Sequence, residues 1–359
     1  PPPPPPIFQA EDCIRDDLEG LVGSEMCIRD RVIKRQIYFI FDFIHVWKMK
    51  IPPVFQSCLF HDFDFFAESI CQGDVRYQQL SAGQFNGSLR QIVRKRLILS
   101  LHEMNQFILQ EGSGVEGYIT FLIPGDMLQD FTWRSNQLKG NVIGVLQGKM
   151  EHHSVTYPNF FGMPVSVEEH FIDELAVALG YEDFAKIISS RECFMVDQNE
   201  LNAIRARIQE VFRDYSKMDD SWEEELAAAL IRLLSGFSRS QPRRMGKTRR
   251  RIHQKAVRYM KEHITEPISI LEVAHAIGVS ERNLRYAFHE VSKMSPKRFF
   301  DRIRLNHVRR SLKSGHFRNV IDVSNAYGFW HSGKFAADYR SLFFEYPSES
   351  LNQNLQELI

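Results

Sequence analysis

A short helix, a glycine turn and a second helix follow one another twice near the C-terminal end of the chain. This repeat constrains the fold more than any other feature of the sequence. In residues 270–280 (ILEVAHAIGVS), Ala274 is small enough for a second helix to pack against the first. Gly278 suits the positive φ of a tight turn, because glycine has no Cβ. The pattern predicts a helix-turn-helix unit whose second helix covers residues 281–291.

The two faces of this predicted second helix have different tasks. Ser280 stands at its N-cap position, and Leu284 and Phe288 fall on the face that packs inward. The opposite face is free to enter the major groove of DNA, where side chains contact base edges. The predicted base-reading residues are Arg282, Asn283, Arg285, Tyr286 and His289.

Residues 320–329 (VIDVSNAYGF) repeat the first helix and turn. Gly328 aligns with Gly278, and a second recognition helix is predicted over residues 332–342. A single match of this kind often arises by chance, whereas two in register are specific, and a predicted helix over residues 296–314 joins them. The residues predicted to build the second unit are Ala326, Gly328, Phe329 and Phe335.

The charge of the chain is divided between its two ends. Residues 241–359 contain 22 Lys and Arg against 11 Asp and Glu, a net charge of +11, and residues 1–240 carry −11. A basic region suits a polyanionic partner such as double-stranded DNA, although solvated basic surfaces without such a partner are common. The charge therefore supports the prediction of DNA binding that the repeated motif makes, but would not establish it alone.

The chain before residue 241 has a different pattern of apolar and turn-forming residues. Between residues 83 and 162, glycine and proline separate short apolar runs such as 97–99, 107–109, 118–123 and 142–146, which is typical of strands. After Pro164 the pattern becomes helical, over residues 167–179, 183–188, 199–215 and 222–234. We therefore predict an α+β chain. A small β barrel or cupin-like domain with trailing helices precedes an all-α domain that holds the two helix-turn-helix units.

Apolar residues in the third of these helices recur at spacings of three and four. They are Leu201, Ile204, Ile208, Val211 and Tyr215. Such a stripe packs against the core of its own domain or forms the seam of a homodimer, and the sequence leaves both open.

Four segments follow from these patterns. Residues 1–48 begin with six prolines and contain two similar short segments, 10–17 and 26–31. They are expected to be a non-native or disordered leader, with the natural start at Met49. Residues 49–236 form the predicted sensor or dimerisation domain, 237–250 a basic linker, and 251–352 the DNA-binding domain.

The C-terminal motifs resemble those of the AraC/XylS family of transcription regulators. The resemblance rests on Ala274 to Ser280, on Arg304-Leu305, on Gly328-Phe329 and on Pro347-Ser348, and it covers about residues 251–351. Residues 328–335 (GFWHSGKF) and 77–87 (YQQLSAGQFNG) are similar to the branch that contains ethanolamine-operon activators.

The sequence departs from the family pattern at two places. Phe344 stands where the family commonly has glycine. The second recognition helix presents Gly333, Ala336 and Ala337 where other members have longer side chains. We therefore expect the first unit to read bases and the second to sit mainly on phosphates. The predicted DNA-backbone contacts are Ser280, Ser332, Lys334 and Arg340.

The resemblance also implies partners and a role. It implies a transcription activator that contacts RNA polymerase and responds to a small effector, here an ethanolamine-like molecule. Tyr118, Phe121 and Trp133 are candidates for the walls of an effector pocket, although such side chains are more often core. A homodimer is a further expectation.

Two other classes of function are alternatives. An architectural DNA-binding protein would bind without sequence preference. A metal-dependent barrel enzyme could use His152 and His153, but neighbouring residues on a strand point to opposite faces and cannot easily share one ion. We expect no enzyme activity.

We expect no cofactor and no metal. No long apolar run or signal peptide is present, so we also expect no membrane partner and a cytoplasmic location. The five cysteines show no paired spacing, which indicates free thiols rather than a zinc site.

Overall fold

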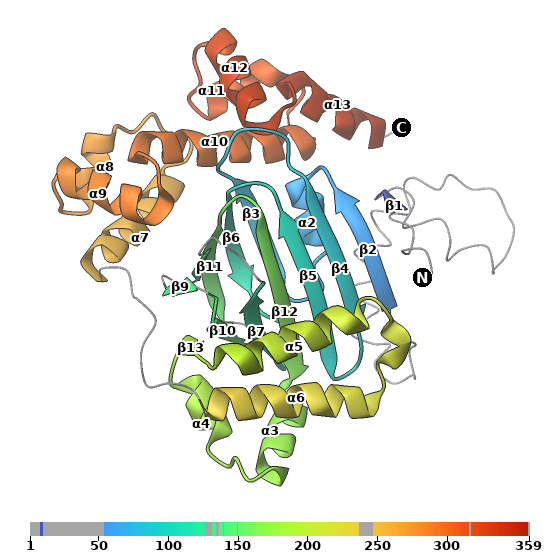
Figure 1. Ribbon diagram of the computed structural model, residues 1–359. Coiled ribbons are helices and arrows are strands. Elements are labelled where there is room, and N and C mark those ends of the chain that lie inside the picture. The colour runs from blue at the N-terminus through green and yellow to red at the C-terminus, as the bar shows by residue number, and fades with distance from the viewer. Residues whose placement is uncertain are drawn as a thin grey trace, which may run out of the picture.

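The computed structural model describes residues 8–9, 54–125, 131–133, 136–138, 140–148, 150–236, 247–315 and 317–357. In these residues two β-sheets are followed by helices that cover one end and one face of the sheets (Figure 1). The predicted α+β class is confirmed. The predicted leader lies outside the described residues apart from residues 8–9, as does most of the predicted linker. The four-segment division therefore stays a prediction.

The larger sheet has the strand order β1-β2-β4-β5-β12-β7-β10-β13. Its neighbours pair antiparallel, except that β1 runs parallel to β2. The strands are β1 Phe8–Gln9, β2 Val54–Phe60, β4 Gly87–Val93, β5 Leu97–Met104, β7 Tyr118–Pro124, β10 Val142–Gln147, β12 Phe160–Glu168 and β13 Cys193–Met195.

The smaller sheet has the order β3-β6-β11-β8-β9 and faces the larger one. Its strands are β3 Asp74–Gln79, β6 Ile108–Ser113, β8 Phe131–Trp133, β9 Asn136–Leu138 and β11 Glu151–Thr156. Among the described residues neither edge of this sheet pairs with the larger sheet, so the two form an open sandwich. The predicted small β barrel or cupin-like domain is therefore present as two facing sheets that do not close.

Four helices pack at the lower part of the larger sheet: α3 Glu169–Ala178, α4 Phe184–Ser189, α5 Gln198–Val211 and α6 Asp220–Ser235. Helices α5 and α6 run across the sheet, and α3 and α4 lie beside α6 at its lower end (Figure 1). Leu201, Ile204, Ile208 and Val211 of α5 are buried here against sheet residues such as Phe121. Four of the five stripe residues are therefore core within one chain. The fifth, Tyr215, is exposed in a short 3-10 turn.

Two of the expected helix boundaries shift. The helix expected from residue 167 begins at Glu169, because residues up to Glu168 continue strand β12 and pair with β7. The helix expected over residues 199–215 ends at Val211.

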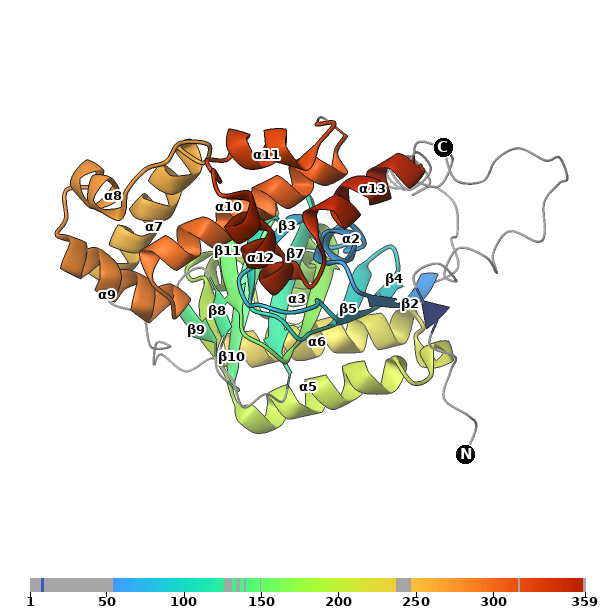
Figure 2. The ribbon, with the colours of Figure 1, turned by 90° about the horizontal axis from the view of Figure 1, so that it is seen from above.

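The C-terminal helices form two groups around one long helix (Figures 1 and 2). They are α7 Lys247–Glu262, α8 Ile270–Ala276, α9 Glu281–Ser292, α10 Pro296–Lys313, α11 Val320–Ala326, α12 Ser332–Phe343 and α13 Pro347–Glu357. Helix α10 begins at an N-cap serine followed by proline, a combination that favours helix initiation. It lies between the upper end of the sheets and helices α11–α13.

Helix α10 is fixed to the edge strand β3 by a side-chain amide. The backbone N–H of Gln79 donates to Asn306 Oδ1 at 2.9 Å, and Asn306 Nδ2 donates to the carbonyl of Gln79 at 2.9 Å. Asn306 is buried. The amide therefore satisfies backbone groups that the edge of the sheet would otherwise leave without partners.

A second contact joins α10 to helix α2 (Phe63–Glu68), which lies beside β3. The Arg309 guanidinium is buried and meets three carboxylates: Asp62 at 2.7 Å, Asp64 at 2.8 Å and Glu345 at 2.7 Å. Arg310 pairs with Asp64 at 3.3 Å, and Lys313 with Asp62. We call these six side chains the Arg309 cluster. Its three acidic and three basic groups balance in charge.

Two further points concern the described residues. Helix lengths and hydropathy there give no segment able to span a membrane.

Cys71 and Cys193 are free thiols, but Cys58 is disulfide-bonded, so the expectation of free thiols is wrong for Cys58. Spacing along the chain does not show which cysteines approach in space.

Replacing Arg309 should destabilise the whole fold. Arg309→Met leaves buried carboxylates without their main partner, and breaking a buried ion pair in this way costs about 3–5 kcal/mol. Arg298→Met, an exposed arginine on the same helix, should change the free energy of unfolding by less than about 0.5 kcal/mol. Urea unfolding of both variants measures the difference. A loss below about 1 kcal/mol for Arg309→Met would contradict the role given to the cluster.

Candidate nucleic-acid interface

The first helix-turn-helix unit is built by α8, a tight turn and α9. Ser269 and Glu272 form a capping box that starts α8. Gly278 has φ +69°, as the sequence predicts, and the N–H of Val279 donates to the carbonyl of Ala274 at 2.9 Å to close the turn. Ser280 caps α9 by accepting from the N–H of Asn283 at 3.2 Å.

The inner face of this unit is buried as predicted. Ala274, Leu284 and Phe288 are all fully buried and pack against helix α7 and the start of α10. Phe288 contacts the ring of Phe299 edge-on, with centroids 5.2 Å apart. The core of the first unit therefore includes residues outside the motif, and it fixes the direction in which α9 points.

The outer face of α9 is exposed to solvent. All five predicted base-reading side chains lie on it: Arg282, Asn283, Arg285, Tyr286 and His289. Arg282 donates to the Tyr286 hydroxyl at 3.1 Å and lies over its ring. Arg285 pairs with Glu281. Exposed contacts of this kind contribute little to stability, so a phosphate or base can replace them.

Arg249 is a neighbour of this face that the motif did not reveal. It lies near the start of α7, and its guanidinium is 5.8 Å from the centre of the Tyr286 ring. In the sequence, only its place in the predicted basic linker indicates that Arg249 could lie near DNA. Arg249 also pairs with Glu290 of α9, so it is held beside the recognition helix.

The second unit, α11 and α12, repeats the turn. Gly328 has φ +72°, and the N–H of Phe329 donates to the carbonyl of Ser324 at 2.8 Å. Phe335 is buried and Phe329 half-buried, with ring centroids 5.3 Å apart. Ala326 is exposed, and the buried small residue of α11 is Ser324. The close-packing position therefore belongs to Ser324.

Arg304 of α10 supports this turn and was not predicted as a site residue. Its side chain is buried over the ring of Phe329 at 4.6 Å, and its Nε donates to the carbonyl of Tyr327 at 2.8 Å. A Cβ on Gly328 would overlap Arg304 Nη2. Gly328 is therefore required both by its backbone angle and by the space that Arg304 occupies.

The outer face of α12 carries fewer long side chains. Ser332, Lys334 and Arg340 are exposed, and Gly333 has open space around it. Lys334 pairs with Asp338 at 2.6 Å, and Arg340 contacts the Tyr346 hydroxyl. This face presents cations and a small-residue surface.

The end of α12 is held by the N-terminal part of the chain. The N–H of Gly83 donates to the carbonyl of Ser341 at 3.1 Å, and Gln79 Nε2 donates to the carbonyl of Leu342 at 2.7 Å. Phe344 then takes φ +62°, a left-handed conformation that glycine adopts more easily. The departure from glycine at this position therefore places a bulky residue in a strained backbone.

The residues of the rejected metal alternative lie apart. His152 is buried between the sheets, and His153 is on the opposite face, 3.0 Å from Glu111. In the part of the chain that the structure describes, no three His, Cys, Asp or Glu side chains are grouped to hold a metal.

Two complete helix-turn-helix units on one supporting helix are the architecture of a DNA-binding domain. Residues 273–353 match the family described as helix-turn-helix domain. The "XylDLEGF operon transcriptional activator" of Pseudomonas putida is 31% identical over 107 residues, 29% of this chain and 33% of that protein. The "XylDLEGF operon transcriptional activator 2" of the same organism is 30% identical over 108 residues, 30% of this chain and 69% of that protein.

A solved structure is also similar in this region. The crystal structure of a probable AraC family transcriptional regulator from Rhodopseudomonas palustris CGA009 has 31% identity, covers 29% of this chain and 97% of its own, and gives a TM-score of 0.28. The chain belongs to the AraC family of transcription regulators. It spans about a third of the length of the first of the relatives above.

The two turn glycines should respond differently to alanine. Gly278→Ala adds a Cβ in open space, so only the positive φ is unfavourable, by about 1 kcal/mol. Gly328→Ala carries the same penalty and also displaces Arg304 from its carbonyl partner, so it should destabilise by about 1–3 kcal/mol more. Thermal unfolding of the two variants provides the comparison. Equal losses would show that Arg304 does not constrain the turn.

Proposed function

We propose that this protein is a sequence-specific DNA-binding transcription regulator, acting as an activator, whose N-terminal part senses an effector or forms a dimer. The observation that carries the proposal is the exposed row of arginine, asparagine, tyrosine and histidine on α9, beside a second unit on the same supporting helix. The net charge of +11 over residues 241–359 suits double-stranded DNA. The relatives named above are transcriptional activators.

In this proposal α9 reads the sequence of the major groove. Arg282 and Arg285 have the geometry to donate two hydrogen bonds to guanine, and Asn283 to pair with adenine, each bidentate contact contributing about 1–3 kcal/mol of discrimination. Tyr286 and His289 extend the same face. For this to occur Arg285 leaves Glu281, and Arg282 leaves Tyr286.

The second unit then positions the protein on the DNA backbone. Lys334 and Arg340 contact phosphates as cations, and Ser280 and Ser332 as hydrogen-bond donors. Helix α10 has 18 residues and is about 27 Å long, so it can hold the two recognition helices near the 34 Å or so that separates successive major grooves.

Other parts of the proposal rest on the family. Contact with RNA polymerase, a homodimer, an effector and a cytoplasmic location are expected of such a regulator. No enzyme activity is part of the proposal. An architectural protein that binds DNA without sequence preference is the alternative.

Selection from a library of random duplexes at two salt concentrations separates these functions. A sequence-reading regulator should enrich a site about two helical turns long, and Arg282→Ala and Arg285→Ala should relax its preference at individual positions. Arg232→Ala, an exposed arginine on α6 with the same charge change, is the matched control and should select the wild-type site.

Salt-sensitive binding with no enriched sequence would reject the regulator and favour the architectural protein.

A further inference from the structure

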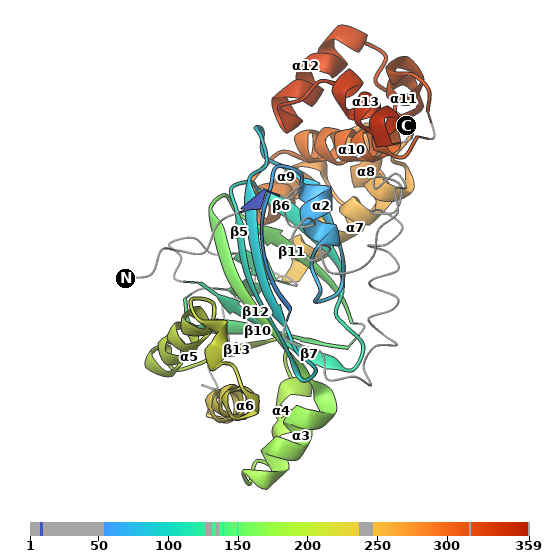
Figure 3. The same cartoon turned by 90° about the vertical axis from the view of Figure 1, so that its right-hand side faces the viewer.

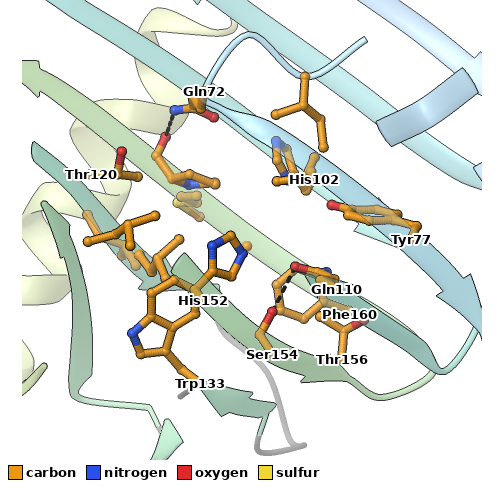
Figure 4. A pocket seen from close by; sticks show the side chains of 18 residues that line it. Gln72, Tyr77, His102, Gln110, Thr120, Trp133, His152, Ser154, Thr156 and Phe160 are labelled. Atoms are coloured by element: carbon orange, nitrogen blue, oxygen red, sulfur yellow. Dashed lines mark hydrogen bonds between the residues drawn. The ribbon is translucent and has the colours of Figure 1, made fainter. Parts of the chain in front are cut away.

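A cavity lies between the two sheets (Figure 4), and Figure 3 shows these sheets below helices α10–α13. Its volume is about 60 Å³. Of the three residues considered from sequence as pocket walls, Trp133 lines the cavity. Phe121 points into the core beneath α5 and α6, and the Tyr118 hydroxyl donates to the carbonyl of Lys95 at 2.8 Å.

Three side chains around the cavity have polar atoms without a hydrogen-bond partner among the described residues. They are Gln72 Oε1, His102 Nε2 and Trp133 Nε1, and all three side chains are more than nine-tenths buried. Gln72 is held in place because its Nε2 donates to the carbonyls of Ile98 and Pro164 at 3.1 and 3.0 Å. Buried polar atoms are nearly always hydrogen-bonded, so these three indicate polar partners beyond the described side chains and backbone.

Among the described residues that line the cavity there is no Asp, Glu, Lys or Arg. Burial lowers the pKa of His102 to about 3, so its ring is neutral near pH 7. An ion placed here would lose its hydration and gain no opposite charge. The remaining walls are apolar, including Leu146, Phe160 and Met163.

We propose that this cavity binds a small uncharged molecule that both donates and accepts hydrogen bonds, such as an amide or a diol. This inference rests on the proposed sensing role for its biological use. An ethanolamine-like effector is protonated near pH 7 and would find no acidic partner, so the cavity does not suit that expectation.

Tryptophan resonances provide a direct test in the full chain without DNA. The protein has four tryptophans, and the indole N–H signal of Trp133 is assigned with Trp133→Phe. The probes are propionamide, propionate and propionamidinium, which share one planar shape and differ in charge. Propionamide should shift the Trp133 signal with an affinity at least about tenfold tighter than either ion, because only the ions leave a buried charge unpaired. The signals of Trp222 and Trp330, on helix α6 and beside α12, should not move.

A second variant changes the preferred charge without removing the site. Gln110 lines the cavity and accepts a hydrogen bond from Ser154 at 3.0 Å, which a glutamate retains. Gln110→Glu should therefore bind propionamidinium more tightly than the wild type does. No response to propionamide, or equal responses to the three probes, would overturn the proposal. Because no DNA is present, either result is independent of the duplex selection.

Discussion

The buried guanidinium of Arg309 is the interaction on which the arrangement of the molecule depends. It stacks 4.7 Å from the ring of Phe63 and 5.4 Å from that of Phe343, and it meets carboxylates from α2 and from the segment after α12. Burial opposes its charge, but Asp62, Glu345 and Asp64 outweigh burial and raise its pKa above the ordinary value. For Asp62 burial likewise opposes ionisation, and Arg309 and Lys313 outweigh it and hold the pKa well below the usual range. One side chain thus joins the N-terminal sheets, α10 and the end of the second recognition helix.

Strand β3 contacts both the cavity between the sheets and helix α10. The side chain of Tyr77 lines the cavity, while its carbonyl accepts a hydrogen bond from Arg310 of α10. Two residues further along, the backbone N–H and carbonyl of Gln79 pair with the side-chain amide of Asn306. One edge strand therefore separates the cavity from the helix that carries both DNA-binding units.

Local features of the fold could be read from the sequence, because they depend on residues close together in the chain. The turns at Gly278 and Gly328 and the N-cap at Ser280 were predicted and are present. Features that depend on distant residues were missed. Arg304 appeared only as part of a family motif, although it supports the second turn from α10, and the partners of Arg309 lie far from it in sequence. The open sandwich and the buried Ser324 also depend on packing that periodicity does not encode.

The central claim is that rigid α10 fixes the spacing between two recognition helices on one DNA site. The most direct test measures the affinity for the selected site before and after 5 or 10 base pairs are inserted between its two halves. A fixed spacing predicts that both insertions lower the affinity to that of a single half, because α10 cannot lengthen to reach either position. An unchanged affinity with either insertion would show that the units bind independently and would contradict the account.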